Sequence, residues 1–216
     1  FFLWGFAHAI LDVLNKHFQE LLTITRTHSA MIQATMYMGY FIMAIPAGLF
    51  INRHGYRRGV VLGLLLYGTG SLLFIPGQYI ASFNMFLFSL FVIGCGLTFL
   101  ETAANPYVTE LGARETAASR LNFAQSFNGL GCIFAPILTG LLLFSDDDKG
   151  AGGNVALPYA VMGVVVLLAA LAFMRVRLPE IPHEEEVDSE GHRVGLWAHK
   201  LFVFGLVALF AYEVSE

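Results

Sequence analysis

Two carboxylates lie inside apolar segments of this 216-residue sequence. Asp12 follows a run of apolar and aromatic residues at the start of the chain, and Glu101 follows the almost wholly apolar residues 85–100. A carboxylate at the centre of a membrane helix costs about 2.5–3.5 kcal/mol on insertion scales, so such residues usually face a protein interior and act in ion or substrate pathways. For Asp12 the alternative is a place near a helix end, where it would only cap or snorkel, because polar residues follow it.

Other polar side chains recur on the same helical faces. Trp4, His8 and Asp12 are spaced four residues apart and form one stripe, and Glu101 and Asn105 are likewise one turn apart. The second apolar segment adds Gln33, with Tyr37 and Tyr40 near it. The fifth segment carries Asn122, Gln125, Asn128 or Gly129, and Cys132 on one face. A single amide in a membrane helix more often joins helices than binds a ligand. The convergence on four segments favours a site whose carboxylates, amides and rings would hydrogen-bond and stack on a sugar-like polyol.

The segments that carry these residues are long and apolar enough to cross a bilayer. Apolar residues make up 56% of the chain and charged residues 13%, about half the roughly 25% of charged residues in soluble domains. A spanning helix needs about 20 largely apolar residues, and such runs predict helices over residues 1–22, 29–51, 59–80, 83–107, 121–144 and 158–174. Another begins near Lys200. The abrupt apolar start and end lead us to expect a piece of a longer protein.

The predicted loops differ in positive charge. Those after the second, fourth and sixth helices hold Arg53, Arg57, Arg58, Arg114, Arg120, Arg175, Arg177, Arg193 and Lys200, whereas the others hold only Lys16, Arg26 and Lys149. Because Lys and Arg are enriched in cytoplasmic loops, we expect the N-terminus and the even-numbered loops inside. The connection after the sixth helix is longer and more polar than the others. It divides the chain into three predicted parts: a six-helix bundle over 1–176, a cytoplasmic loop over 177–199, and the start of a seventh helix over 200–216.

The two carboxylates would occupy equivalent positions if the six helices form two inverted three-helix repeats, since the first and fourth helices then correspond. Burial favours the neutral form of a carboxyl group, so Asp12 or Glu101 could carry a proton. The same oxygens could instead bind sodium, and the sequence leaves both ions open. We expect no other cofactor, no metal site and no catalytic residues, because the seven histidines are scattered and neither Cys95 nor Cys132 has ligand spacing.

Residues 48–58 resemble the G-x-x-x-D-R-x-G-R-R/K signature of the major facilitator superfamily. We expect a conformational gating motif here, formed by Gly48, Asn52, Arg53, Gly55, Arg57 and Arg58. Asn52 replaces the Asp of the signature and Tyr56 replaces an Arg, so the state-dependent cytoplasmic salt bridge that the signature implies is not carried over. The alternative is a basic turn that only anchors the chain by its positive charge.

Further stretches resemble the fucose/glucose/galactose:proton symporter family. They are residues 1–4 with Asp12 downstream, Gln33 followed by residues 39–42, residues 100–106 and residues 120–128. The resemblance implies the N-terminal half of a monomeric twelve-helix transporter of the bacterial inner membrane that imports a sugar with a proton. It ties the positions of Asp12 and Glu101 to proton coupling and sugar binding, and places Gln125 and Asn128 in a central cavity. His8 and Ala9 replace asparagines of the fucose branch, so glucose and galactose stay open beside fucose.

We therefore expect an all-α membrane protein that takes up a monosaccharide by alternating access. Asp12 and Glu101 would couple the proton, and the expected sugar ligands are Glu101, Asn105, Gln125, Asn128, Gln33, His8 and Trp4. Its partners would be the sugar, the bilayer and the C-terminal half, without nucleic acid. A sodium-coupled symporter and a non-transporting sugar sensor are the alternatives. An enzyme lacks a catalytic cluster, and a channel is disfavoured because the following glycines suit close helix packing: Gly63, Gly68, Gly70, Gly129 and Gly131.

Overall fold

The computed structural model describes residues 1–10, 26–80, 82–144, 156–176, 203–205 and 207–208. The chain forms two compact units, Phe1–Ile181 and Pro182–Glu216. The described residues of the second unit are helical. Asp12 and most of the expected loop and seventh helix lie outside the described residues.

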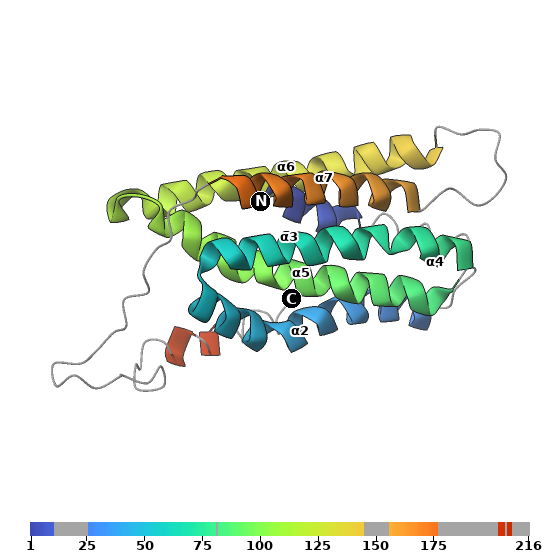
Figure 1. The fold of residues 1–216 in the computed structure, drawn as a ribbon, viewed down its shortest axis with the longest axis horizontal. Helices are drawn as coiled ribbons and strands as arrows, with labels where there is room; N and C mark the ends of the chain where they lie inside the picture. Colours follow the sequence, from blue (N-terminus) through green and yellow to red (C-terminus); the bar gives the residue numbers. More distant parts are fainter. Residues whose placement is uncertain (11–25, 81, 145–155, 177–202, 206, 209–216) are drawn as a thin grey trace. The chain divides into compact units, whose positions relative to one another are not determined.

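The first unit is a bundle of helices, as the sequence predicts (Figure 1). Residues 2–10 form the described part of the first helix. The others are α2 (Arg26–His54), α3 (Tyr56–Leu72), α4 (Phe74–Ile80), α5 (Phe83–Glu110), α6 (Ala117–Phe144) and α7 (Ala156–Arg175), with a 3-10 turn η1 (Arg114–Thr116) before α6. Four stretches of the described helices are long and apolar enough to cross a membrane: Met31–His54, Tyr56–Ile80, Phe83–Glu110 and Leu157–Arg175.

The third predicted helix differs from its expected form. The sequence predicts one helix over residues 59–80, whereas the chain forms α3 and the seven-residue α4 with Leu73 between them. Pro76 explains the break, because a proline ring clashes with the carbonyl group four residues earlier, which belongs to Leu72. Leu73 keeps a right-handed helical conformation, so the axis is interrupted without a loop.

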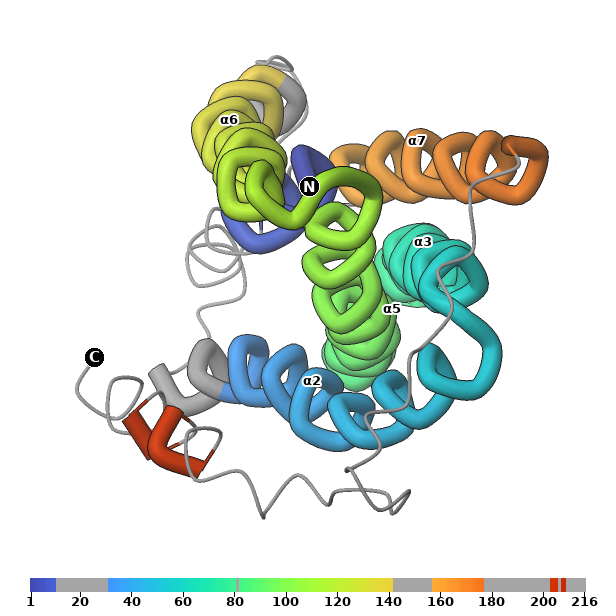
Figure 2. Tube along the Cα trace, turned by 90° about the vertical axis from the view of Figure 1, so that its left-hand side faces the viewer, coloured from blue at the N-terminus to red at the C-terminus, as the bar shows by residue number. Residues whose placement is uncertain are grey.

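Glycines allow the backbones of neighbouring helices to approach closely. A Cβ atom added to Gly63 of α3 would lie 2.9 Å from the carbonyl oxygen of Gly96 in α5, and one added to Gly94 would lie 2.5 Å from the carbonyl oxygen of Met36 in α2. On the other side of α3, a Cβ atom at Gly163 of α7 would lie 3.0 Å from the carbonyl oxygen of Gly68. The end-on view shows the result: α5 lies between α2 and α3, and α7 lies beside α3 (Figure 2).

The first helix packs against α6 by the same device. The added Cβ atom of Gly5 would collide with the backbone of Asn128, and that of Gly131 with the carbonyl oxygen of Phe2. The prediction of close packing is thus confirmed at Gly63, Gly68, Gly70 and Gly131, each of which has a helix neighbour within van der Waals distance of the added atom. At Gly129 it is not borne out, because no atom of the described residues lies within 4 Å of the added Cβ.

The C-terminus of α5 is closed by a side chain from α6. Arg120 donates from Nη2 to the carbonyl oxygen of Thr109 at 2.7 Å, from Nε to that of Val108 at 3.2 Å, and from Nη1 to that of Ala113 at 3.0 Å. The last carbonyl groups of a helix have no partners inside it, so the guanidinium supplies them and fixes the turn into α6. From the sequence Arg120 is one of the positive loop charges; its role at the end of α5 is visible only in the structure.

We expect Gly96→Ala to destabilise the protein, because the new Cβ atom would lie 2.5 Å from the backbone nitrogen of Tyr67 and neither helix can yield without moving its backbone. Overpacking of this kind costs about 1–3 kcal/mol. Gly129→Ala is the matched control: it adds a methyl group in open space and gains helix propensity. Thermal unfolding of the full-length protein in detergent measures both, and equal melting temperatures for the two variants would contradict this view of the α3–α5 contact.

Candidate functional site

His8 joins the first helix to α2. Its Nε2 atom lies 3.4 Å from the hydroxyl oxygen of Tyr40, and its Nδ1 atom lies 3.2 Å from the carbonyl oxygen of Trp4. The ring of Trp4 meets the imidazole edge-on, with centroids 6.2 Å apart. The predicted stripe of Trp4 and His8 is therefore present, and it faces Tyr40, a residue outside the expected set of sugar ligands.

Glu101 of α5 lies near Tyr40. Its carboxylate is half-buried and close enough to Tyr40 for the two groups to interact electrostatically. The indole N–H of Trp4 also faces the Tyr40 phenol. This N–H is buried, and it forms no hydrogen bond with the described residues that meets the usual geometric criteria. Tyr40 thus connects Glu101 with Trp4 and His8, an association between helices that the sequence alone could not show.

The predicted amides on α5 and α6 form a direct contact. Gln125 donates from Nε2 to Oδ1 of Asn105 at 3.1 Å. Asn105 follows Glu101 by one helical turn, so the carboxylate and the amide pair lie on one face of α5. This hydrogen bond fixes the position of both amides and joins α6 to the face of α5 that carries Glu101.

Asn128 lies where the first helix crosses α6. Its backbone is in contact with Gly5, and its Oδ1 atom lies 3.8 Å from the thiol of Cys132. The same thiol donates to the carbonyl oxygen of Gly5 at 3.4 Å. In the described residues Asn128 therefore contributes to helix packing, and its side chain points along the Cys132 stripe that the sequence predicts.

Gln33 is less closely associated with the other candidates. It lies two turns before Tyr40 on α2, and its side chain is exposed, as is that of Tyr37. Tyr37 links the two positions, because its ring centroid lies 6.4 Å from that of Tyr40. Gln33 makes no hydrogen bond with another candidate residue that the structure describes. The role expected for Asp12 falls on a residue outside the described part.

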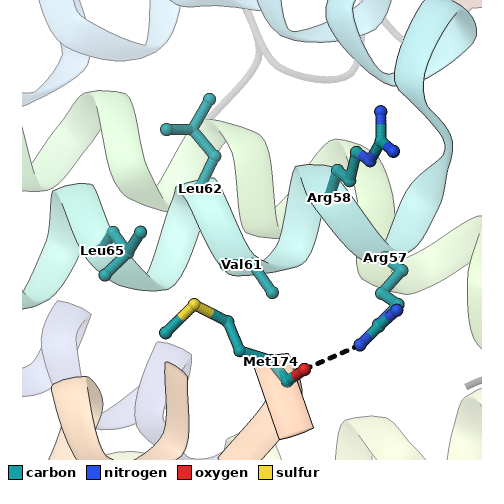
Figure 3. Close-up of a pocket in the computed structure, with 6 residues that line it drawn as sticks. All are labelled: Arg57, Arg58, Val61, Leu62, Leu65 and Met174. Carbon is teal, nitrogen blue, oxygen red and sulfur yellow. Dashed lines mark hydrogen bonds between the residues drawn. The ribbon is translucent and has the colours of Figure 1, made fainter. Parts of the chain in front are cut away.

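The basic motif is a junction of two helices rather than a turn of several residues. Only Gly55 interrupts the helical conformation between α2 and α3, with a φ of 86° that favours glycine. Arg57 donates from Nη2 to the carbonyl oxygen of Met174 at 2.8 Å (Figure 3), which joins the start of α3 to the end of α7. Asn52, Arg53 and Arg58 are exposed, and none of the described atoms lies within 4 Å of a Cβ atom added to Gly48.

The described arrangement combines groups of complementary chemistry. It holds a carboxylate that can accept a proton or hydrogen bonds, amides and a phenol that can both donate and accept, and aromatic rings that can stack on an apolar ring face. An apolar cavity of about 310 Å³ lies behind Trp4 and is lined by residues such as Leu64, Leu100 and Tyr107, without a charged side chain. Of the candidate residues only Trp4 lines this cavity; Glu101, Asn105 and His8 are not among its lining residues.

Comparisons with known proteins agree with this architecture. Residues 1–214 match the family model described as Major Facilitator Superfamily. The chain is 36% identical over 220 residues to a glucose/galactose transporter of Brucella abortus, covering 100% of this chain and 53% of that protein. It is also 36% identical over 209 residues to the L-fucose-proton symporter of Escherichia coli, covering 88% of this chain and 48% of that protein.

A solved structure gives the same result. The crystal structure of a variant of the E. coli fucose:proton symporter superposes with a TM-score of 0.69 at 35% identity, over 82% of this chain and 47% of that chain. The chain spans about half the length of the curated relatives it matches.

A double-mutant cycle tests the contact between Asn105 and Gln125. We expect the two alanine substitutions to be coupled by about 0.6 kcal/mol in the free energy of unfolding of the full-length protein, the average for hydrogen bonds between membrane helices. Asn105→Ala with Asn122→Ala is the control, because Asn122 is an exposed amide of the same α6. Coupling of the same size in both cycles would show that the Asn105–Gln125 geometry is not the source.

Proposed function

This chain belongs to the Major Facilitator Superfamily, and we propose that it is the N-terminal half of a proton-coupled monosaccharide symporter. It is an all-helical, multi-pass membrane protein. One observation carries the proposal: a carboxylate, Glu101, shares one helix face with the Asn105–Gln125 amide pair and interacts with Tyr40 and, through it, His8. The similarity to transporters described as glucose/galactose and L-fucose-proton carriers supports a sugar substrate.

The proposed roles follow from the chemistry of each group. Glu101 would accept hydrogen bonds from sugar hydroxyls, and Asn105 and Gln125 would donate and accept. Trp4 offers an indole face and an N–H, and His8 a ring nitrogen. Gln33 and Asn128 stay candidates at the margins of this cluster. Asp12 is our first choice as the proton carrier, with Glu101 titrating together with it.

The transport cycle that we propose is alternating access. The site opens outward with a carboxylate protonated, sugar binds, and the two halves rock about the bound sugar. Proton release on the inner side then favours sugar release. The gating motif of Gly48, Asn52, Arg53, Gly55, Arg57 and Arg58 would adjust at the α2–α3 junction during this motion.

The proposed topology completes the picture. Residues 1–176 would form the N-terminal bundle, 177–199 a cytoplasmic loop, and 200–216 the start of the seventh helix. The N-terminus and the even-numbered loops would lie in the cytoplasm of a bacterial cell, as the excess of Arg and Lys in these loops indicates. The functional unit would be a monomer completed by the C-terminal half.

Sugar-induced alkalinisation decides between the proposed function and its alternatives. In right-side-out vesicles that carry the full-length protein, we expect addition of fucose, galactose or glucose to raise the external pH, because each imported sugar removes an external proton. Mannose is tested in the same way as the fourth sugar. Uptake of labelled sugar without a pH change would favour sodium coupling, and binding without uptake would favour a sensor.

We expect Glu101→Gln to retain sugar exchange while proton-driven accumulation is lost. The amide keeps the shape of the side chain and, like the protonated acid, can both donate and accept hydrogen bonds, but it cannot change charge. Glu110→Gln is the matched control, because Glu110 is an exposed carboxylate at the end of the same helix α5. Counterflow of labelled sugar measures exchange and uptake at an imposed proton gradient measures accumulation. Unaltered accumulation in Glu101→Gln would exclude Glu101 from coupling.

A further inference from the structure

A shallow pocket lies on the surface between the start of α3 and the end of α7, away from the proposed sugar site. Its volume is about 310 Å³, and it is lined by Arg57, Arg58, Val61, Leu62, Leu65 and Met174 (Figure 3). Its two arginines belong to the gating motif proposed above, but no step of the proposed transport cycle places a ligand in this pocket. Its composition divides into a charged end and an apolar floor.

The charged end is suited to an anion. Arg57 uses one of the five N–H donors of a guanidinium for the carbonyl oxygen of Met174, so this bond orients the group at the pocket's edge. Arg58 is exposed. Both arginines lie in the first turn of α3, where the helix dipole adds partial positive charge. Guanidinium groups bind phosphate oxygens in a bidentate manner.

The apolar floor continues from the charged end along α3. Arg57, Val61 and Leu65 follow one another at one-turn spacing, and Arg58 and Leu62 form the adjacent row (Figure 3). The three apolar side chains of α3 are half-exposed, and Met174 of α7 is 42% exposed. A free phosphate would occupy only the charged end, whereas a phosphate that carries an acyl chain fits both parts.

The position of the pocket also matches a lipid. α3 and α7 belong to stretches apolar enough to span the membrane, and α7 has no charged residue before Arg175. The arginines therefore lie where the apolar spans end, the depth of phospholipid headgroups. Basic pockets between membrane helices are a known way of holding anionic headgroups.

We propose that this pocket binds an anionic phospholipid, with its phosphate on Arg57 and Arg58 and the upper part of an acyl chain along Val61, Leu62 and Leu65. The bound lipid would join the start of α3 to the end of α7, at the contact that Arg57 already makes with Met174. The proposal does not depend on which sugar or ion the protein carries.

Titration of the full-length protein in detergent with phosphatidylglycerol, followed by native mass spectrometry, tests the proposal. We expect Arg58→Gln to raise the dissociation constant about fivefold, since a basic side chain at an anionic surface contributes about 1 kcal/mol and 1.4 kcal/mol is tenfold. Arg58 is the better test than Arg57, because no hydrogen bond between helices depends on it in the described residues. Arg114→Gln is the control, an exposed arginine outside the pocket, and should leave binding unchanged.

Headgroup and chain are tested separately. We expect weaker binding of phosphatidylcholine, which is neutral overall, and of dihexanoyl phosphatidylglycerol, which has the same headgroup but a short chain. Equal affinity of wild type and Arg58→Gln, or an equal loss in Arg114→Gln, would overturn the site. Displacement of the lipid by an equal concentration of inorganic phosphate would show that the site binds an anion without requiring an acyl chain, and would contradict the proposed lipid ligand.

Discussion

The close approach of α5 to its two neighbours is the constraint on which the rest of the bundle depends. Gly94 lets α2 reach its backbone, and Gly96 does the same for α3. In a membrane the hydrophobic effect does not drive helices together, so close van der Waals packing and hydrogen bonds between helices hold them. The polar face of α5 begins two turns after Gly94: Glu101 lies near Tyr40 of α2, and Asn105, one turn further on, meets Gln125 of α6.

The polar face is open on one side among the described residues. Tyr40 and Glu101 are partly buried, but Tyr37 is 61% exposed and Phe41 beside it 84% exposed. α6 likewise exposes Phe123, at 69%. A sugar carries hydroxyl groups around its ring, and each one removed from water without a partner costs free energy. Binding from one side only would leave several unpaired, so in the proposed function the C-terminal half would supply further donors and acceptors.

Much of this arrangement was predictable from the sequence, and the physical reasons are clear. Long apolar runs predict the helices, and the cost of burying Glu101 predicts that it lies beside other polar groups. Contacts between segments could not be predicted: His8 was expected beside Asp12, and only the crossing of the first helix with α2 shows that Tyr40 lies against it. The break between α3 and α4 could have been predicted from Pro76, because its ring clashes with the carbonyl group of Leu72. Gly129 was expected to allow close packing, but a glycine in a helix does not by itself indicate that another helix lies beside it.

The helix junction at Gly55 shows how a departure from a family signature can be accommodated. With Asn52 in place of an aspartate, the junction lacks the carboxylate of the usual salt bridge, and Asn52 is exposed. The bond from Arg57 to the carbonyl oxygen of Met174 needs no acidic partner, because it uses the orphan carbonyl groups at the end of α7. A change in the angle between α2 and α3 must therefore either carry the end of α7 with it or break this bond. The junction is tied to the last helix of the bundle by backbone chemistry, which no substitution at position 52 removes.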